Sequence, residues 1–435
     1  MSLIENHLID RFYCLNFPYV VQYSHHPVRR HTMKKFIRLF LMVLVLALAN
    51  SSFSISESSP ADALDLKAMH EERVFACLTT LTRYLTDDLD IFGTQKEFVQ
   101  NSDAWNKMLR YDRGWFSKHI SKTIKNQSTD HWTRISDTEF CAEAYCDFEV
   151  QYIAGRESVI YPCAYHFCFI KTDAAKDPWM VKDFHVIQNP DDQSFADRFT
   201  SENEGVSLSP VSGNTFTGFM MTIDDPSRVF VGTIPRFDNA SDGMQIDKLI
   251  KLHDAIGGIN GGGFDEGPGG SGRPSGVVVT NGVFRKSHHP YNQLTGVLIG
   301  FDQDNKLHVG NFYNNETAQL NLRDALGFGP ALIIDGIPQE TGETRNDYSS
   351  RTAIGQDAQG RVLMLVARGR QPDSMGADMK DLTKIMLDFG AVNAGNLDGG
   401  SSTAMYYNNE IVFSGFRLEP SRAIPTAFLI RKLPE

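Results

Sequence analysis

The sequence predicts an α+β protein in which a larger C-terminal domain of mixed α/β structure, rich in glycine loops, follows a smaller α+β domain. Three observations support this fold class. The chain has 435 residues, which suits two domains or so. Apolar residues at helical spacing alternate with β-branched runs in both halves. Of 35 glycines, 13 fall between Gly257 and Gly300, so permissive loops concentrate in one region.

Composition excludes several classes of protein. Hydrophobic residues make up 41% and charged residues 22%, values that are ordinary for a globular chain and unlike a polytopic membrane protein. The net charge of −11 opposes nucleic-acid binding, because neutralising phosphates requires a basic surface. We therefore expect no nucleic-acid partner.

The N-terminal region resembles an export signal that begins at a second methionine. Residues 1–32 show no sustained period and are interpreted as an unstructured extension or a start-site artefact. From Met33, basic residues precede the apolar run Leu39–Ala49, which ends in a small-x-small cleavage pattern. An 11-residue run is too short to favour a membrane span. We expect residues 33–49 to be a signal peptide and the mature chain to be secreted or extracytoplasmic, in a periplasm or at a cell surface. The alternative is an uncleaved tether.

The cysteines offer two candidate disulfides in the first domain. Cys141, Cys146, Cys163 and Cys168 lie in two strand-like runs, and both 141+168 and 146+163 equal 309. A constant sum is the register of an antiparallel pair, so each sum places two cysteines opposite each other. An oxidising compartment would allow both disulfides to form. Positions five apart alternate in face and ladder type, however, and the two bridges together would require a bulge. The alternative interpretation is small buried cysteines.

Domain boundaries follow changes in the pattern. Residues 64–189 read as helices followed by strands, an order that loosely resembles the cone-shaped nuclear-transport-factor-like fold. Residues 190–214 are polar and read as a linker. Residues 215–432 form the second domain, with predicted helices that stop at Gly257 and Gly390. The segments around Asp302 and Asp357 resemble each other and predict hairpins with the aspartates as turn formers.

Four short segments of the second domain carry the residues suited to chemistry. Three of them are the glycine-rich run "INGGGF" that starts at Ile259, the strand-terminal Asp335 and the strand start "RTAIG" at Arg351. The fourth is "NLDGGSST", residues 396–403, which places an aspartate before two glycines and three hydroxyl groups. A nearby G-x-G-x-x-G at Gly267–Gly272 leads into a strand, so a dinucleotide site is not expected.

Together, these segments resemble the phosphodiester glycosidase family. The resemblance covers about residues 215–432 and depends most on "NLDGGSST", with support from "INGGGF", "RTAIG" and the Ala367–Arg370 run. It implies hydrolysis of a sugar-1-phosphodiester at the bond between C1 and oxygen, releasing a free sugar and a phosphomonoester. The expected substrate is an extracytoplasmic glycan or glycoconjugate, including exopolysaccharide, and no cofactor or metal ion is expected.

Candidate roles follow from the residue types. Asp398 is the first candidate for the carboxylate that stabilises an oxocarbenium-like transition state, with Asp335 second. Arg351 is the candidate for neutralising the departing phosphate, with Arg370 as the second choice. The candidate substrate-binding residues, which would contact sugar hydroxyls or phosphate oxygens, are Asn260, Gly261, Gly399, Gly400, Ser401 and Arg370.

Two other functions stay open from the sequence. A metal-dependent phosphodiesterase would cut the P–O bond with Asp335, Asp398 and His288 or His289 as ligands. A non-catalytic cell-surface module would only bind carbohydrate through the glycine-rich loops. The products separate the first alternative, and an Asp398→Asn variant separates the second.

Overall fold

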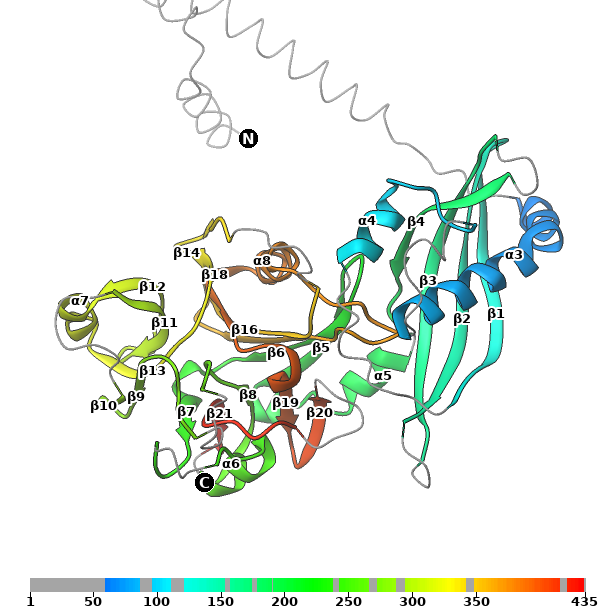
Figure 1. The fold of residues 1–435 in the computed structure, drawn as a ribbon. Coiled ribbons are helices and arrows are strands. Elements are labelled where there is room, and N and C mark those ends of the chain that lie inside the picture. Colours follow the sequence, from blue (N-terminus) through cyan, green and yellow to red (C-terminus); the bar gives the residue numbers. More distant parts are fainter. Residues whose placement is uncertain are drawn as a thin grey trace, which may run out of the picture. The chain divides into compact units, whose positions relative to one another are not determined.

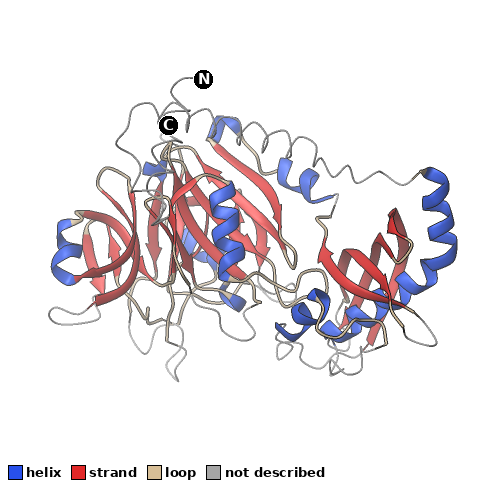
Figure 2. Cartoon of the chain, turned by 90° about the horizontal axis from the view of Figure 1, so that it is seen from above, coloured by secondary structure: helices blue, strands red, loops and turns tan. Residues whose placement is uncertain are grey.

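The computed structural model describes residues 59–86, 96–110, 121–152, 157–173, 178–189, 191–237, 242–265, 272–286, 294–341, 348–414 and 421–433. All of these residues belong to one compact unit, Ser58–Glu435. The predicted signal peptide and the upstream extension lie outside the described residues, as do His288 and His289. Strands predominate in the described chain, and helices flank the sheets (Figures 1 and 2).

The part of the chain that the sequence predicts as the first domain contains a four-stranded antiparallel sheet with two preceding helices; below, this part and the part predicted as the second domain keep those names. The helices are α3 (Pro60–Thr86) and α4 (Asp103–Arg110), and the sheet has the order β1-β2-β3-β4. Its strands are β1 (Ser121–Ser136), β2 (Glu139–Gln151), β3 (Val159–Lys171) and β4 (Trp179–Val186). Helix α3 lies along one face of the sheet (Figure 1) and buries Leu78, Leu81 and Leu85, the residues whose spacing predicts it. Helices followed by a sheet is the predicted order.

The cysteine register is as predicted, and only one pair is bridged. Strands β2 and β3 pair continuously, with Cys141 opposite Cys168 and Cys146 opposite Cys163. A disulfide joins the first pair, whose Cα atoms lie 4.2 Å apart. That spacing is typical of a non-hydrogen-bonded pair, where side chains approach most closely. The second pair, five residues along, lies on the opposite, core-facing side of the sheet and is not joined in a disulfide. The pairing contains no bulge, so the two pairs occupy opposite faces.

Residues 190–214, which the sequence predicts to be a linker, instead contain regular structure. They include α5 (Asp191–Asp197), a 3-10 turn at Glu202–Glu204 and β5 (Val206–Ser212). Strand β5 pairs with β6 (Thr217–Ile223) at the edge of a sheet and buries Val206, Leu208 and Val211. The polar residues between these apolar positions form the partly exposed side of the edge strand.

Three further sheets build the second domain. The seven-stranded sheet has the order β15-β14-β18-β16-β17-β6-β5, and the two five-stranded sheets have the orders β10-β9-β13-β11-β12 and β20-β19-β8-β21-β7. The strands of the seven-stranded sheet not yet given are β14 (Ala331–Ile334), β15 (Ile337–Pro338), β16 (Arg351–Asp357), β17 (Val362–Ala367) and β18 (Ala391–Leu397). Those of the first five-stranded sheet are β9 (Val278–Thr280), β10 (Val283–Lys286), β11 (Leu294–Asp302), β12 (Leu307–Tyr313) and β13 (Leu322–Gly327). Those of the second are β7 (Val229–Thr233), β8 (Ala255–Asn260), β19 (Ala404–Tyr407), β20 (Glu410–Ser414) and β21 (Thr426–Arg431). The remaining helices are α6 (Ile246–Leu252), α7 (Asn314–Gln319) and α8 (Met379–Asp388), with short 3-10 turns at Pro226–Arg228 and Gly400–Ser402.

The core of the second domain explains why β17 is a continuous apolar run. Val362, Met364 and Val366 pack with residues of both five-stranded sheets, whereas Leu363 and Leu365 pack with α8. A strand that is buried on both faces needs apolar residues at every position. The seven-stranded sheet is therefore the central layer of this domain.

Local sequence signals correctly predict the turns at Gly390, Asp302 and Asp357, but the predicted helix stop at Gly257 is wrong. Gly390 ends the turn after α8 with φ of 80°, as predicted. The side chains of Asp302 and Asp357 accept hydrogen bonds from backbone amides of their hairpin turns, also as predicted. Helix α6, however, ends before the predicted stop: Asp254 adopts φ of 49°, and Gly257 lies inside β8.

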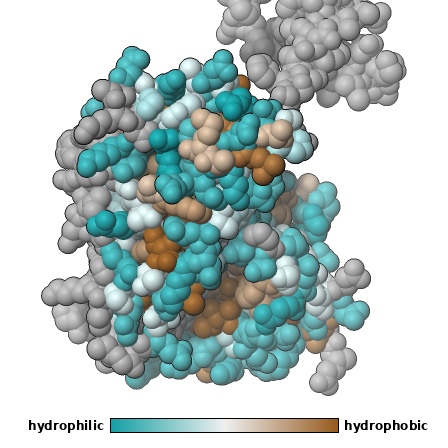
Figure 3. Space-filling view, turned by 90° about the vertical axis from the view of Figure 1, so that its right-hand side faces the viewer, coloured by the Kyte–Doolittle hydropathy of each residue, from teal (hydrophilic) through white to brown (hydrophobic). Residues whose placement is uncertain are grey.

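The face shown in Figure 3 is mostly hydrophilic, with hydrophobic side chains gathered in small separate patches. Among the described residues, no helix combines the length and the apolar character needed to cross a bilayer.

Candidate active site

The ends of four strands meet at one place in the second domain. Strand β18 ends immediately before Asp398, β16 begins at Arg351, β8 ends at Asn260, and β17 ends three residues before Arg370. Thr352 lies opposite Leu397 in the ladder between β16 and β18. The next position in register places Arg351 beside Asp398, within the spacing of cross-strand neighbours. The structure therefore brings together the first-choice carboxylate and the first-choice arginine.

Three arginines from separate segments line the turn that follows Asp398. A β-carbon built on Gly399 would lie 3.7 Å from Cδ of Arg351, and one built on Gly400 would lie 3.8 Å from Nη1 of Arg370. Nη1 of Arg422 donates to the hydroxyl of Ser401 at 3.2 Å. Three consecutive residues thus each adjoin a guanidinium side chain. This concentration of positive charge along the turn after Asp398 suits an anionic substrate group.

The side chain of Asn260 holds this turn from the buried side and does not face solvent. It is fully buried, and its Nδ2 donates to the backbone carbonyl of Asp398 at 2.7 Å. Its Oδ1 accepts from the Thr352 hydroxyl at 2.7 Å and from the Ala404 amide at 3.1 Å. The sequence predicts a substrate contact for Asn260, whereas these bonds engage its amide group within the protein. Its role in the structure is to hold Asp398 in place.

The glycines serve close packing of the chain. A β-carbon at Gly261 would lie 2.5 Å from Oγ1 of Thr426, and the Gly261 carbonyl accepts from the Asp398 amide at 3.1 Å. The amide of Gly399 donates to Oδ1 of Asp398 at 3.0 Å, and that of Gly400 donates to the Ser350 carbonyl at 2.7 Å. In this structure the amides of Gly399 and Gly400 therefore have their partners inside the protein.

The loop that carries Arg370 also contacts the first domain. Arg370 adopts φ of 56°, and its amide donates to the Met375 carbonyl at 2.9 Å. Met375 is packed in the core of the first domain, and the Tyr165 hydroxyl of β3 donates to the Pro372 carbonyl. Where the loop meets α8, Arg110 of α4 forms a 2.6 Å ion pair with Asp378. The first domain therefore helps to fix the loop beside the candidate site.

Two carboxyl groups at the start of α8 have perturbed pKa values. Asp378 and Asp381 exchange side-chain-to-amide hydrogen bonds in a capping box. Burial and the adjacent charge of Asp378 raise the pKa of Asp381 to about 7. Burial alone would raise the pKa of Asp378, but hydrogen bonds from Arg110 and from the Asp381 amide hold it below its ordinary value.

The structure separates Asp335 from the other candidates. Asp335 is exposed in the hairpin turn between β14 and β15, and its amide donates to Oδ1 of Asn393 at 2.9 Å. Asn393 precedes Asp398 by five residues along β18, which corresponds to about 16 Å at the rise of a β-strand. Asp335 does end a strand, as predicted, but at the opposite end of the sheet. It is not the second carboxylate of this site.

Sequence reasoning missed two contributors to the site. Thr352 lies inside the "RTAIG" segment and bonds Asn260, but the sequence gives no sign of that partner. Arg422 follows a stretch with no recognisable pattern, and its guanidinium lies 4.9 Å from the ring centroid of Phe264. Only the fold brings Arg422 to Ser401. Among the residues that the structure describes, no group of three or more metal-ligating side chains includes Asp398 or Asp335.

The second domain is similar to known proteins over much of its length. Residues 253–431 match the model of the phosphodiester glycosidase family. N-acetylglucosamine-1-phosphodiester alpha-N-acetylglucosaminidase of Bos taurus is 36% identical over 146 residues, covering 32% of this chain and 24% of the relative. The enzyme of that name from Mus musculus is 30% identical over 146 residues, covering 32% and 25%. The uncharacterized SPbeta prophage-derived protein YomE of Bacillus subtilis is 26% identical over 200 residues, covering 42% and 29%. The chain thus spans about a quarter of the length of these relatives.

The catalytic domain of zebrafish N-acetylglucosamine-1-phosphodiester alpha-N-acetylglucosaminidase, auto-inhibited by its pro-peptide, aligns with a TM-score of 0.44 at 20% identity, covering 54% of this chain and 86% of that domain. Residues 253–431, the region that matches the family model, include Asn260, Arg351, Arg370 and Asp398.

Proposed function

We propose that this chain, whose residues 253–431 match the phosphodiester glycosidase family, hydrolyses a sugar-1-phosphodiester between C1 and oxygen. The products are a free sugar and a phosphomonoester. The observation that carries the proposal is the turn Asp398–Ser401, in which a carboxylate residue is followed by three residues that adjoin Arg351, Arg370 and Arg422 in turn. An anionic leaving group and a positively charged anomeric centre need those two kinds of residue side by side.

The arginines act on the phosphodiester. A phosphate monoester is a good leaving group, so its departure requires neutralisation of developing charge more than protonation by an acid of raised pKa. The planar guanidinium of Arg351 binds two phosphate oxygens at once, and Arg370 and Arg422 add charge from the other sides of the turn. Their common placement along Gly399–Ser401 supports a phosphate site over this turn.

Asp398 acts on the sugar. Its carboxylate stabilises the oxocarbenium-like transition state, either as the nucleophile or as the base for water. Two backbone bonds fix its position: its amide donates to the Gly261 carbonyl and its carbonyl accepts from Asn260. A fixed carboxylate avoids reorganisation during the reaction, which is the basis of electrostatic catalysis.

We further propose that the enzyme acts outside the cytoplasm on a glycan or glycoconjugate. The signal-like sequence of residues 33–49 supports export, and the Cys141–Cys168 disulfide is in keeping with an oxidising compartment.

The test is product analysis with a GlcNAc-1-phosphodiester, with and without EDTA, by mass spectrometry. Free sugar and a phosphomonoester in the presence of EDTA are expected. Sugar phosphate and alcohol would instead identify a phosphodiesterase that cuts the P–O bond. Asp398→Asn should abolish turnover, and Asp335→Asn is the matched control that should retain it. Glycan binding without turnover by the unmodified chain would support the carbohydrate-binding alternative.

A further inference from the structure

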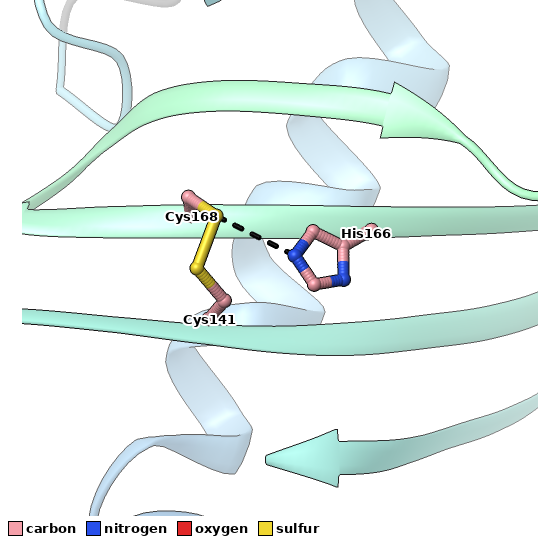
Figure 4. Close-up of side chains that lie close together, drawn as sticks. All are labelled: Cys141, His166 and Cys168. Atoms are coloured by element: carbon pink, nitrogen blue, oxygen red, sulfur yellow. Dashed lines mark hydrogen bonds between the residues drawn. A yellow bond between two sulfur atoms is a disulfide. The ribbon is translucent and has the colours of Figure 1, made fainter. Parts of the chain in front are cut away.

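A second cluster of chemically reactive side chains lies in the first domain, on the sheet face opposite α3. Cys141, Cys168 and His166 project together from β2 and β3 (Figure 4), and one potential ligand atom from each lies within 4.8 Å of the others. Nε2 of His166 lies 3.5 Å from Sγ of Cys168. The catalytic proposal uses none of these residues.

The spacing of this cluster matches the ligand separation at a tetrahedral metal ion. Zinc binds thiolate sulfur at about 2.3 Å and imidazole nitrogen at about 2.0 Å, and a tetrahedral angle then separates the two atoms by about 3.5 Å. The observed separation between Sγ of Cys168 and Nε2 of His166 is 3.5 Å. The Cα atoms of Cys141 and Cys168, 4.2 Å apart, keep the two sulfurs adjacent when the bridge is opened.

The surroundings of His166 also suit a metal ligand. Nδ1, the ring nitrogen that does not face Cys168, lies 4.0 Å from Oε1 of Glu143. A carboxylate hydrogen-bonded to the far nitrogen is the usual partner of a metal-binding histidine, because it orients the ring; Glu143 lies near this position, beyond hydrogen-bond distance. The ring also stacks on His185 with centroids 4.6 Å apart. The His166 side chain is 23% exposed, so the cluster is reachable from solvent.

We propose that the reduced protein binds one soft divalent metal ion, such as zinc, through Cys141, Cys168 and His166, and that the disulfide is the metal-free form. A dithiol reductant opens the bridge: two electrons and two protons pass to the two sulfurs, and the reductant becomes its own disulfide. The metal ion then displaces the two thiol protons to solvent, because thiolate is the binding form. Water completes the coordination.

The other cysteine pair provides a matched control. Cys146 and Cys163 lie opposite each other on the same two strands, but on the core-facing side. They are 4% and 2% exposed, and among the residues that the structure describes neither belongs to a group of three metal-ligating side chains. A site that depends on the outer cluster should be insensitive to changes in this inner pair.

The experiment titrates cobalt(II) into the full chain after reduction with a phosphine and removal of the reductant without oxygen. Cobalt reports thiolate ligation through a sulfur-to-metal charge-transfer absorbance, and zinc should displace it. We expect one equivalent bound by the reduced protein and none by the oxidised protein. Cys146→Ser should bind as the unmodified protein does, and Cys168→Ser should lose the charge-transfer band.

His166→Ala provides the decisive variant because it leaves the disulfide and both sulfurs in place. Its affinity for cobalt should fall at least about tenfold, an effect that thiol ligation alone does not predict. The proposal is overturned if the reduced protein shows no charge-transfer band, if the oxidised protein binds equally well, or if His166→Ala leaves the affinity unchanged.

Discussion

Asn260 offers a sharp test of how the candidate active site is held together. Replacing it with alanine removes three hydrogen bonds, those to the Asp398 carbonyl, the Thr352 hydroxyl and the Ala404 amide. Thr352 and Ala404 are 0% and 1% exposed, so water cannot easily replace their lost partner, whereas Asp398 is only half-buried. Each buried polar group left unsatisfied costs about 1–3 kcal/mol. Two such groups give an expected loss of about 4 kcal/mol in the free energy of unfolding.

The assay is urea and thermal unfolding of Asn260→Ala beside Asn106→Ala, an exposed control on α4. A loss of this size corresponds to a drop in Tm of about 8–16 °C for a domain of this length, and the control should stay within about 0.5 kcal/mol. Where the variant is still folded, kcat should fall more than KM changes, because Asn260 positions Asp398 and presents no exposed atom to substrate. A stability within about 1 kcal/mol of the unmodified protein would refute this reasoning.

Three further predictions follow from other contacts. Arg351→Lys should lower turnover about a hundredfold or more with the fold intact, because a point charge lacks the planar fork; an unchanged rate, beside the exposed control Arg198→Lys, would remove Arg351 from the mechanism. Asp381→Asn should stabilise the protein above pH 7 by on the order of 1 kcal/mol. In the unmodified protein, the raised pKa of Asp381 makes the free energy of unfolding fall as pH rises from about 4 to about 7. The stability gained by the Asp381→Asn substitution should therefore disappear below about pH 4, which unfolding curves recorded across this pH range would show. Cys168→Ser should lower the free energy of unfolding by about 3.5 kcal/mol without reductant and much less with it, since the bridge spans 27 residues. Cys146→Ser should show no such dependence on reductant, and equal melting of both variants in both conditions would contradict the assignment of the bridge.

The sequence predicts local features of the fold well where one short segment contains the whole signal. The cysteine register follows from a constant sum of residue numbers, and the hairpin turns follow from Asp302 and Asp357. The end of helix α8 is marked by Gly390. Each of these features depends on residues that are close together or on adjacent strands.

Features that depend on the packing of distant segments were not predictable. The sequence predicts a linker over β5, because only the pairing of this strand with β6 shows that its alternating residues are half-buried. Asp335 ends a strand, but the sequence does not show at which end of the sheet that strand terminates. Asn260 resembles a ligand-binding residue in its glycine-rich run until its partners on β16 and β19 are known. Arg422 joins the site only through the fold.

The central claim is that this site cleaves the bond between C1 and oxygen, and the position of bond cleavage tests it most directly. The measurement is hydrolysis of a GlcNAc-1-phosphodiester in water labelled with heavy oxygen, followed by mass spectrometry of both products. The account predicts that the phosphomonoester contains no heavy oxygen, because water attacks the sugar and the phosphate keeps its original oxygens. Heavy oxygen in the phosphorus-containing product would contradict the account, because it would mean that water attacked phosphorus.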